Sequence, residues 1–177
     1  VGKTTAARIA LEKVRELSYT PFDDKSKFVE VDGTTLRWDP REITNPLLGS
    51  VHDPIYQGSK KDLAEVGVPE PKTGLVTEAH GGVLFIDEAY SIMASKGGSA
   101  SNYPAECIAT ICKAMELYPK DLIVIFAGYT KEMNEFINAN QGLMSRIGYE
   151  LEFPDFSKEE LIQIFKDEVN GNEFTLE

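Results

Sequence analysis

Two short stretches of the sequence carry residue types that could bind and split a nucleotide. The chain opens VGKTT, in which Gly2, Lys3 and Thr4 match the closing half of the phosphate-binding pattern GxxxxGK[ST]. A glycine lets the backbone approach an anion, a lysine ammonium pairs with the β- and γ-phosphates, and a hydroxyl can bind Mg²⁺. We therefore expect this loop, Thr5 included, to contact nucleotide phosphates, with Thr4 as a ligand of Mg²⁺. Alone, the triplet is a weak signal, because GKT occurs by chance in many proteins.

The second stretch, GGVLFIDE at residues 81–88, is a continuous apolar run that ends in two carboxylates. Such runs are typical of strands buried on both faces of a parallel sheet. At the carboxyl end of a strand, Asp87 could hold Mg²⁺, directly or through water, and Glu88 could polarise the attacking water. The alternative is a buried strand that runs into solvent, where acidic residues are common. Because both stretches occur in one chain, we predict nucleotide hydrolysis, with Asp87 as a binding residue and Glu88 as the catalytic one.

The next apolar run, at residues 121–129, also ends in polar groups. Tyr129 ends this run and Thr130 follows it, where a side chain could contact the γ-phosphate or the attacking water, so we name both as candidate catalytic residues. The sequence contains no NKxD-like motif for guanine recognition. The expected nucleotide is therefore ATP.

Composition and charge restrict the possible partners. The 177 residues suffice for one domain with a sizeable core, and the hydrophobic (42%) and charged (27%) fractions are ordinary for a soluble globular protein. A formal net charge of −11 repels phosphate backbones and anionic membranes, so we expect no nucleic acid and no membrane as partner. Cys107 and Cys112 are expected to be buried and reduced, as in a cytoplasmic protein.

Hydrophobic periodicity predicts that helices and strands alternate. We expect helices at residues 3–17, 105–118 and 131–140, and strands at residues 27–33, 81–88, 121–129 and 149–153. Residues 39–75 are expected to form long loops around a short helix. Ser157 and Glu160 form a capping box that opens a further helix. This order favours a three-layer α/β fold with a mostly parallel sheet.

The motifs together resemble the AAA+ ATPases. The opening GKT and the segments NPLLGSVHDPIYQG and VPEPKTGLVTEAHGGVLFIDE, all within residues 1–88, closely resemble the ATPase domain of LonB-type ATP-dependent proteases. From residue 89 onward, AECIATICKAME, AGYTKEMNEFINANQGLMSRI and FPDFSKEEL instead resemble the CbbX and stage V sporulation protein K group. Both groups are AAA+, so the resemblance covers the whole chain and is composite, with the seam at the strand that ends in Asp-Glu.

The resemblance implies a fold and its boundaries. Residues 1–156 would form the αβα P-loop NTPase core of an AAA+ protein, and residues 157–177 would begin its α-helical lid. The first strand and the first half of the phosphate loop would precede residue 1, so that the core would be N-terminally truncated in this chain.

The resemblance also implies roles for two further sites. Arg146, in a turn before the expected last strand, would be an arginine finger that reaches the nucleotide of a neighbouring subunit; the alternative is a solvated loop arginine. Tyr56, Gln57 and Gly58, an aromatic followed by a flexible pair, would form the substrate pore loop, because an aromatic ring can grip many polypeptide side chains by packing. The alternative there is an ordinary loop tyrosine.

We therefore expect an ATP-hydrolysing AAA+ motor, with ATP and Mg²⁺ as cofactors, that remodels or unfolds protein substrates. It would work in the cytoplasm as a homo-oligomeric ring, expected to be a hexamer. One alternative is the ATPase module of a Lon-type protease whose Ser–Lys protease domain lies outside this chain. A second alternative is a nucleotide-gated binding scaffold without turnover, against which the intact Glu88 counts.

Overall fold

The structure is a computed structural model that describes residues 2–37, 45–52, 70–93 and 103–171. The longer elements are α1 (Lys3–Arg15), β1 (Phe28–Asp32), β4 (Gly82–Asp87), α5 (Tyr103–Leu117), β5 (Leu122–Phe126), α6 (Thr130–Asn138) and α8 (Lys158–Gly171). The shorter ones are η1 (Thr35–Arg37), α2 (Asn45–Leu48), β2 (Gly49–His52), β3 (Glu70–Thr73), α4 (Leu75–Ala79), η3 (Ala89–Met93) and α7 (Gln141–Met144). The alternation of helices and strands that the sequence predicts is confirmed for all the longer elements.

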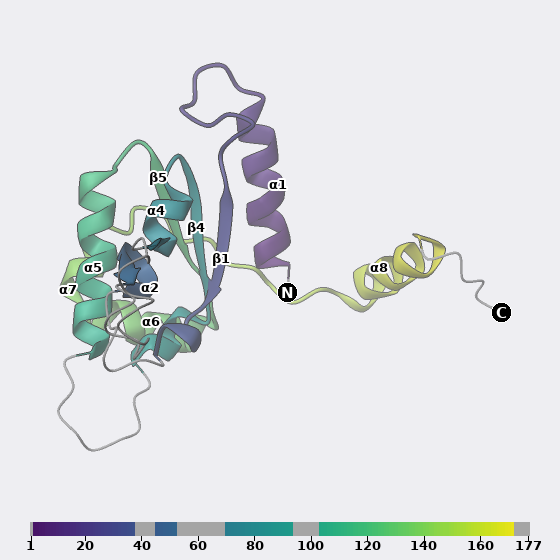
Figure 1. The fold of residues 1–177 in the computed structure, drawn as a ribbon. Helices are drawn as coiled ribbons and strands as arrows, with labels where there is room; N and C mark the ends of the chain where they lie inside the picture. The colour runs from purple at the N-terminus through teal and green to yellow at the C-terminus, as the bar shows by residue number, and fades with distance from the viewer. Residues whose placement is uncertain (1, 38–44, 53–69, 94–102, 172–177) are drawn as a thin grey trace, which may run out of the picture.

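A parallel sheet of three strands, in the order β1-β4-β5, forms the middle layer. Helix α1 covers one face, and α5 lies on the opposite face (Figure 1). Because the strands are parallel, their carboxyl ends meet at one edge of the sheet, and the last aligned pair of β1 and β4 is Asp32 with Asp87. This arrangement is the predicted three-layer αβα architecture.

Strand β4 is buried on both faces, as its unbroken apolar sequence predicts. Successive side chains of a strand point to opposite faces. Val83 and Phe85 pack with Leu11 of α1, whereas Leu84 and Ile86 belong to the larger core on the other face. All four are at most 3% exposed, so the central strand links the two halves of the core.

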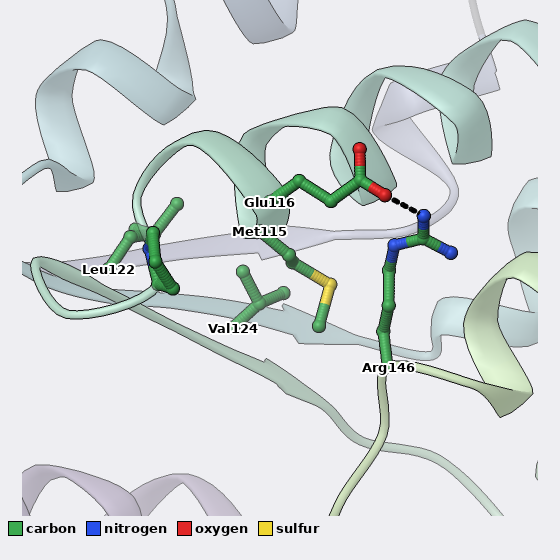
Figure 2. Close-up of a pocket in the computed structure, with 6 residues that line it drawn as sticks. Met115, Glu116, Leu122, Val124 and Arg146 are labelled. Atoms are coloured by element: carbon green, nitrogen blue, oxygen red, sulfur yellow. Dashed lines mark hydrogen bonds and ion pairs between the residues drawn. The ribbon is translucent and has the colours of Figure 1, made fainter.

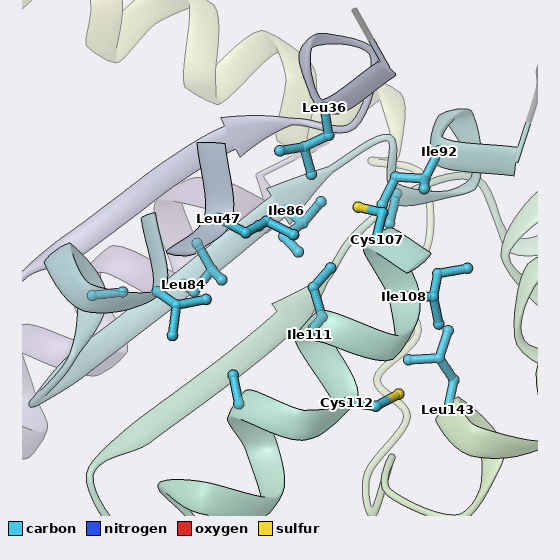
Figure 3. Close-up of a cluster of buried hydrophobic side chains, with 14 of the residues drawn as sticks. Leu36, Leu47, Leu84, Ile86, Ile92, Cys107, Ile108, Ile111, Cys112 and Leu143 are labelled. Atoms are coloured by element: carbon cyan, nitrogen blue, oxygen red, sulfur yellow. The ribbon is translucent and has the colours of Figure 1, made fainter. Parts of the chain in front are cut away.

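The larger core lies between the sheet and α5, with contributions from the short helices around it. Figure 3 shows the buried side chains of this core, which include Leu36, Leu47, Leu84, Ile86, Ile92, Cys107, Ile108, Ile111, Cys112 and Leu143. Both cysteines are free and buried here, as predicted. Each contributes to the core as a small apolar side chain.

A second, antiparallel pair of strands, β2 and β3, was not expected from the sequence. It pairs Gly49 with Thr73 and His52 with Glu70. The sequence prediction assigned long loops to this region because its prolines and glycines obscure a strand signal. Residues 53–69, which connect the pair, lie outside the described residues, and the candidate pore loop Tyr56–Gly58 is among them.

The strand predicted at residues 149–153 is wrong. The structure describes this segment without regular secondary structure, and Tyr149 and Leu151 are 93% and 81% exposed. Alternation of apolar and polar residues suits a strand, but a strand also needs a neighbour for its backbone groups. Within the described residues, β5 pairs with β4 only, and no strand pairs with residues 149–153.

Helix α8 begins with the predicted capping box and stands apart from the core (Figure 1). The Glu160 carboxylate accepts hydrogen bonds from the Ser157 backbone N–H at 2.8 Å and hydroxyl at 2.9 Å, and the Glu160 N–H donates to the Ser157 hydroxyl at 3.3 Å. These bonds, the backbone one first, lower the pKa of Glu160. No helix among the described residues is long and apolar enough to cross a membrane.

Candidate nucleotide-hydrolysis site

Helix α1 begins at the carboxyl edge of the sheet with the backbone that the phosphate-binding pattern demands. Gly2, the residue before the helix, has φ 85° and ψ 2°, a left-handed conformation that only glycine adopts without strain. The first turn contains no acidic residue. The unpaired N–H groups and the partial positive charge of this helix end therefore have no negative side chain of that turn beside them.

The Lys3 side chain joins the start of α1 to the end of β5. Its ammonium donates a hydrogen bond to the Gly128 carbonyl at 2.8 Å and lies 5.6 Å from the centre of the Tyr129 ring. Both contacts suit a cation, because a carbonyl oxygen and an aromatic face are electron-rich. The structure therefore brings together two predicted site residues, Lys3 and Tyr129.

The two acidic residues lie at the end of β4. Asp87 is the last residue of the strand, and its Oδ1 accepts a hydrogen bond from the Glu88 N–H at 3.0 Å. Glu88 has φ 45°, which makes it the single described residue other than glycine with positive φ. Such backbone is costly for a residue with a Cβ and is found mainly where the surrounding structure imposes it. Both side chains are half-buried.

Backbone hydrogen bonds hold the ends of β4 and β5 together. The Ala127 N–H donates to the Ile86 carbonyl at 2.9 Å, and the Ala89 N–H donates to the Ala127 carbonyl at 3.0 Å. The Asp87–Glu88 turn is thus fixed directly beside Gly128, the residue whose carbonyl holds Lys3. The predicted cation and the predicted carboxylates accordingly lie at the same edge of the sheet.

Tyr90, which sequence reasoning did not single out, lies beside the candidate site residues. Its ring centre lies 6.4 Å from that of Tyr129. Burial raises the pKa of Tyr90, and the negative charges of Glu88, Tyr129, Glu132 and Asp87 raise it further, so its phenol is close to the acidic pair and stays protonated. The sequence could have indicated this residue, because Tyr90 stands only two positions after Glu88 in the stretch Asp-Glu-Ala-Tyr at the end of the strand.

The three threonines occupy different positions. Thr4, in the first turn of α1, is half-buried, and no described group bonds its hydroxyl. Thr5 is exposed one residue further on. Thr130 is exposed and begins α6, with Tyr129 at its N-cap.

Arg146 lies on the other side of the sheet, against its own α5. One guanidinium nitrogen, Nη2, pairs with the Glu116 carboxylate, and the other, Nη1, donates to the Gly142 carbonyl at 2.7 Å and to the Ser145 hydroxyl at 3.2 Å. Figure 2 shows the pair beside Met115 and Val124, at a hollow of about 250 Å³.

This hollow also includes Leu122, the first residue of β5, whereas Lys3 contacts Gly128 after that strand has ended. The hydrogen bonds of Arg146 are thus with Glu116, Gly142 and Ser145, and none of these bonds is with Lys3, Asp87 or Glu88.

Comparison with known proteins identifies the class. The model of the ATPase family associated with various cellular activities (AAA) matches residues 1–155, and the chain belongs to this family. The fold and the hydrolytic edge described above agree with that assignment.

Three relatives show what the chain is similar to. Lon protease 2 of Bacillus subtilis is 57% identical to the chain over 88 residues, which is 50% of the chain and 16% of that protein. Stage V sporulation protein K of the same organism is 40% identical over 125 residues, which is 69% of the chain and 38% of that protein. A chloroplastic ribulose bisphosphate carboxylase/oxygenase activase of Cyanidioschyzon merolae is 42% identical over 112 residues, which is 63% of the chain and 36% of that protein.

Both halves of the predicted composite resemblance are therefore confirmed. The match to stage V sporulation protein K is longer than residues 89–177, so the likeness to this relative also includes part of residues 1–88. The chain spans well under half the length of each of these relatives.

Proposed function

We propose that this chain is the ATP-hydrolysing module of an AAA+ motor. The observation that carries the proposal is the meeting of Lys3, Asp87 and Glu88 at one sheet edge, next to a helix end with no acidic residue in its first turn. Binding of a polyphosphate needs the cation and the helix end, and hydrolysis needs the carboxylates. A site that only bound nucleotide would not require Glu88.

The described residues fit Mg-ATP. The Lys3 ammonium is held by a carbonyl oxygen, not by a carboxylate, so a phosphate oxygen can replace its partner with a gain in charge pairing. Oδ1 of Asp87 bonds the Glu88 N–H, which orients the carboxylate and leaves Oδ2 for the metal or its water. When bound, ATP supplies the phosphoryl group, and Mg²⁺ neutralises the charge on its oxygens.

Each residue of the site then has a proposed role. Gly2 and the first N–H groups of α1 cradle phosphate, Lys3 pairs with the β- and γ-phosphates, and Thr4 and Asp87 hold Mg²⁺. Glu88 accepts the proton of the attacking water or orients it. Tyr129 and Thr130, after β5, are proposed to contact the γ-phosphate or that water.

At the level of the whole protein, we propose a homo-oligomeric ring, a hexamer, that remodels protein substrates in the cytoplasm. The family and the printed name of the carboxylase/oxygenase activase support a protein as substrate. The finger role of Arg146 and the pore role of Tyr56, Gln57 and Gly58 belong to the same proposal.

A second candidate is the motor of a Lon-type protease, which the 57% identity to Lon protease 2 favours. The two candidates differ in what happens to the substrate. A full-length protein that degrades an unstructured protein such as casein in the presence of ATP would support the Lon-type motor. A protein that unfolds a tagged substrate and releases it intact would support the stand-alone remodelling ATPase.

The binding half of the proposal is tested by Lys3→Ala in the full-length protein, with Lys13→Ala as the matched control. Lys13 lies on the same helix, exposed and in its last turn. We expect Lys3→Ala to weaken Mg-ATP binding by about 10- to 100-fold, because a hydrogen bond to a charged group contributes about 1.5–3 kcal/mol. Isothermal titration calorimetry measures this. Equal affinity in the two variants would contradict the proposal.

A further inference from the structure

The backbone of Gly33 touches the backbone of Glu88. Gly33 follows β1, is buried, and donates its N–H to the Asp87 carbonyl at 2.7 Å. A Cβ built on Gly33 would lie 2.6 Å from the Glu88 carbonyl oxygen, 3.1 Å from the Glu88 carbonyl carbon and 3.2 Å from the Ala89 Cα. Real Cβ atoms essentially never approach another heavy atom to 2.6 Å, so no residue but glycine fits here without displacing the main chain of Glu88.

The contacted residue is the one with strained backbone. Glu88 has a φ of 45°. Its carbonyl oxygen accepts the Ser91 N–H at 2.7 Å, and the Gly33 backbone packs against the same carbonyl group. A residue with positive φ persists only when its surroundings determine it. A displaced Glu88 carbonyl would turn the residue about its own Cα and re-aim the carboxylate.

The segment around Gly33 is itself held in place. The Thr34 N–H donates to Asp32 Oδ1 at 2.7 Å, and the Thr35 hydroxyl donates to the Asp32 carbonyl at 2.8 Å. These bonds fold the chain tightly after β1, so that Gly33 stays against the Asp87–Glu88 turn.

We propose that Gly33 is a positioning residue for hydrolysis: its lack of a side chain lets the end of β1 lock the Glu88 backbone in the orientation that aims the carboxylate at the attacking water. The proposal rests on the catalytic role of Glu88 proposed above. By this proposal the end of strand β1 also positions the catalytic residue, and Gly33 does so without contacting nucleotide, metal or water.

Gly82 offers a matched control, because it lies at the opposite end of the paired strands β1 and β4. A Cβ on Gly82, the first residue of β4, would lie 2.1 Å from the Lys27 carbonyl oxygen, beside the start of β1. Gly82→Ala therefore strains the same strand pair as severely as Gly33→Ala, but about 20 Å from Glu88, at about 3.3 Å per strand residue.

The experiment compares Gly33→Ala and Gly82→Ala in the full-length protein, with Mg-ATP affinity measured by calorimetry and turnover by phosphate release. We expect Gly33→Ala to keep its affinity near wild type and lose turnover on the order of 10²-fold, the effect of a small misplacement of a reacting group. Gly82→Ala should lose stability with little loss of turnover per folded molecule. In the Glu88→Gln background, adding Gly33→Ala should lower turnover little further, because both changes act on one group.

Normal turnover in Gly33→Ala, or an equal loss in Gly82→Ala, would overturn the proposal. If Gly33→Ala does not fold, Thr35→Val replaces it, since it removes only the hydroxyl bond behind Gly33. We then expect turnover several-fold lower at unchanged affinity, and normal turnover would overturn the proposal. Absence of ATP hydrolysis in the wild-type protein would instead refute the proposed function itself.

Discussion

The guanidinium of Arg146 is paired with the carboxylate of Glu116, on helix α5 of its own chain. The arginine side chain is 28% exposed and the glutamate side chain 59% exposed, and the arginine Nε is buried without a hydrogen-bond partner among the described residues. The bonds to Glu116, Gly142 and Ser145 hold the guanidinium against its own chain. The proposed finger role predicts that the pair opens when subunits assemble, which frees the guanidinium for a neighbouring nucleotide.

Replacing Arg146 by alanine should leave ATP binding near normal and reduce turnover by about 10³-fold or more, because a guanidinium that stabilises transition-state charge is worth about 10³–10⁵ in rate. Turnover should return in part when Arg146→Ala subunits are mixed with Lys3→Ala subunits, which lack a binding site but still carry the arginine. Normal turnover in Arg146→Ala would show that it is no finger, and lost turnover without rescue would show that it acts within its own chain.

The change Glu116→Gln should make Arg146 easier to recruit. A partly exposed pair contributes about 0.2–1 kcal/mol, so at protein concentrations where the ring is half assembled we expect turnover to rise by up to about fivefold. Glu106→Gln, an exposed change in the first turn of the same helix, is the control. Turnover measured against protein concentration checks this, and a fall in Glu116→Gln would mean that the pair supports activity.

The buried thiols should be inert in the folded protein. Burial raises the pKa of Cys107 from 9.0 to about 12, and burial also raises that of Cys112, an effect that the nearby Arg146 charge partly offsets. A thiol that stays neutral when folded but ionises above 9.0 when unfolded favours the unfolded state as pH rises from 9 towards 12. Unfolding by urea should therefore become easier over this range, and less so in Cys107→Ala. An equal pH dependence in both proteins would contradict this.

The sequence predicted the elements that carry the candidate site because each of them has a local signal. Gly2 and Lys3 open a periodic helix, and the run before Asp87 and Glu88 is apolar at every position, as a strand buried on both faces requires. Neither prediction depends on distant residues, and the structure places both elements at one sheet edge.

Features that depend on partners distant in the sequence could not be predicted. Residues 149–153 have the alternation of a strand but no described strand pairs with them. The contact of Gly33 with Glu88 depends on the register of β1 against β4, which periodicity does not reveal. The pairing of Arg146 with Glu116 likewise joins residues 30 positions apart.

The most direct test of the account is the change Glu88→Gln in the full-length protein. The amide keeps the size and the strained backbone of the glutamate but cannot accept a proton from water. We expect Mg-ATP affinity to stay near wild type and turnover to fall about 10²–10⁴-fold, the usual contribution of a general base. Calorimetry and phosphate release measure the two quantities on one sample. Turnover near wild type, or a loss of affinity as large as the loss of turnover, would contradict the catalytic role of Glu88.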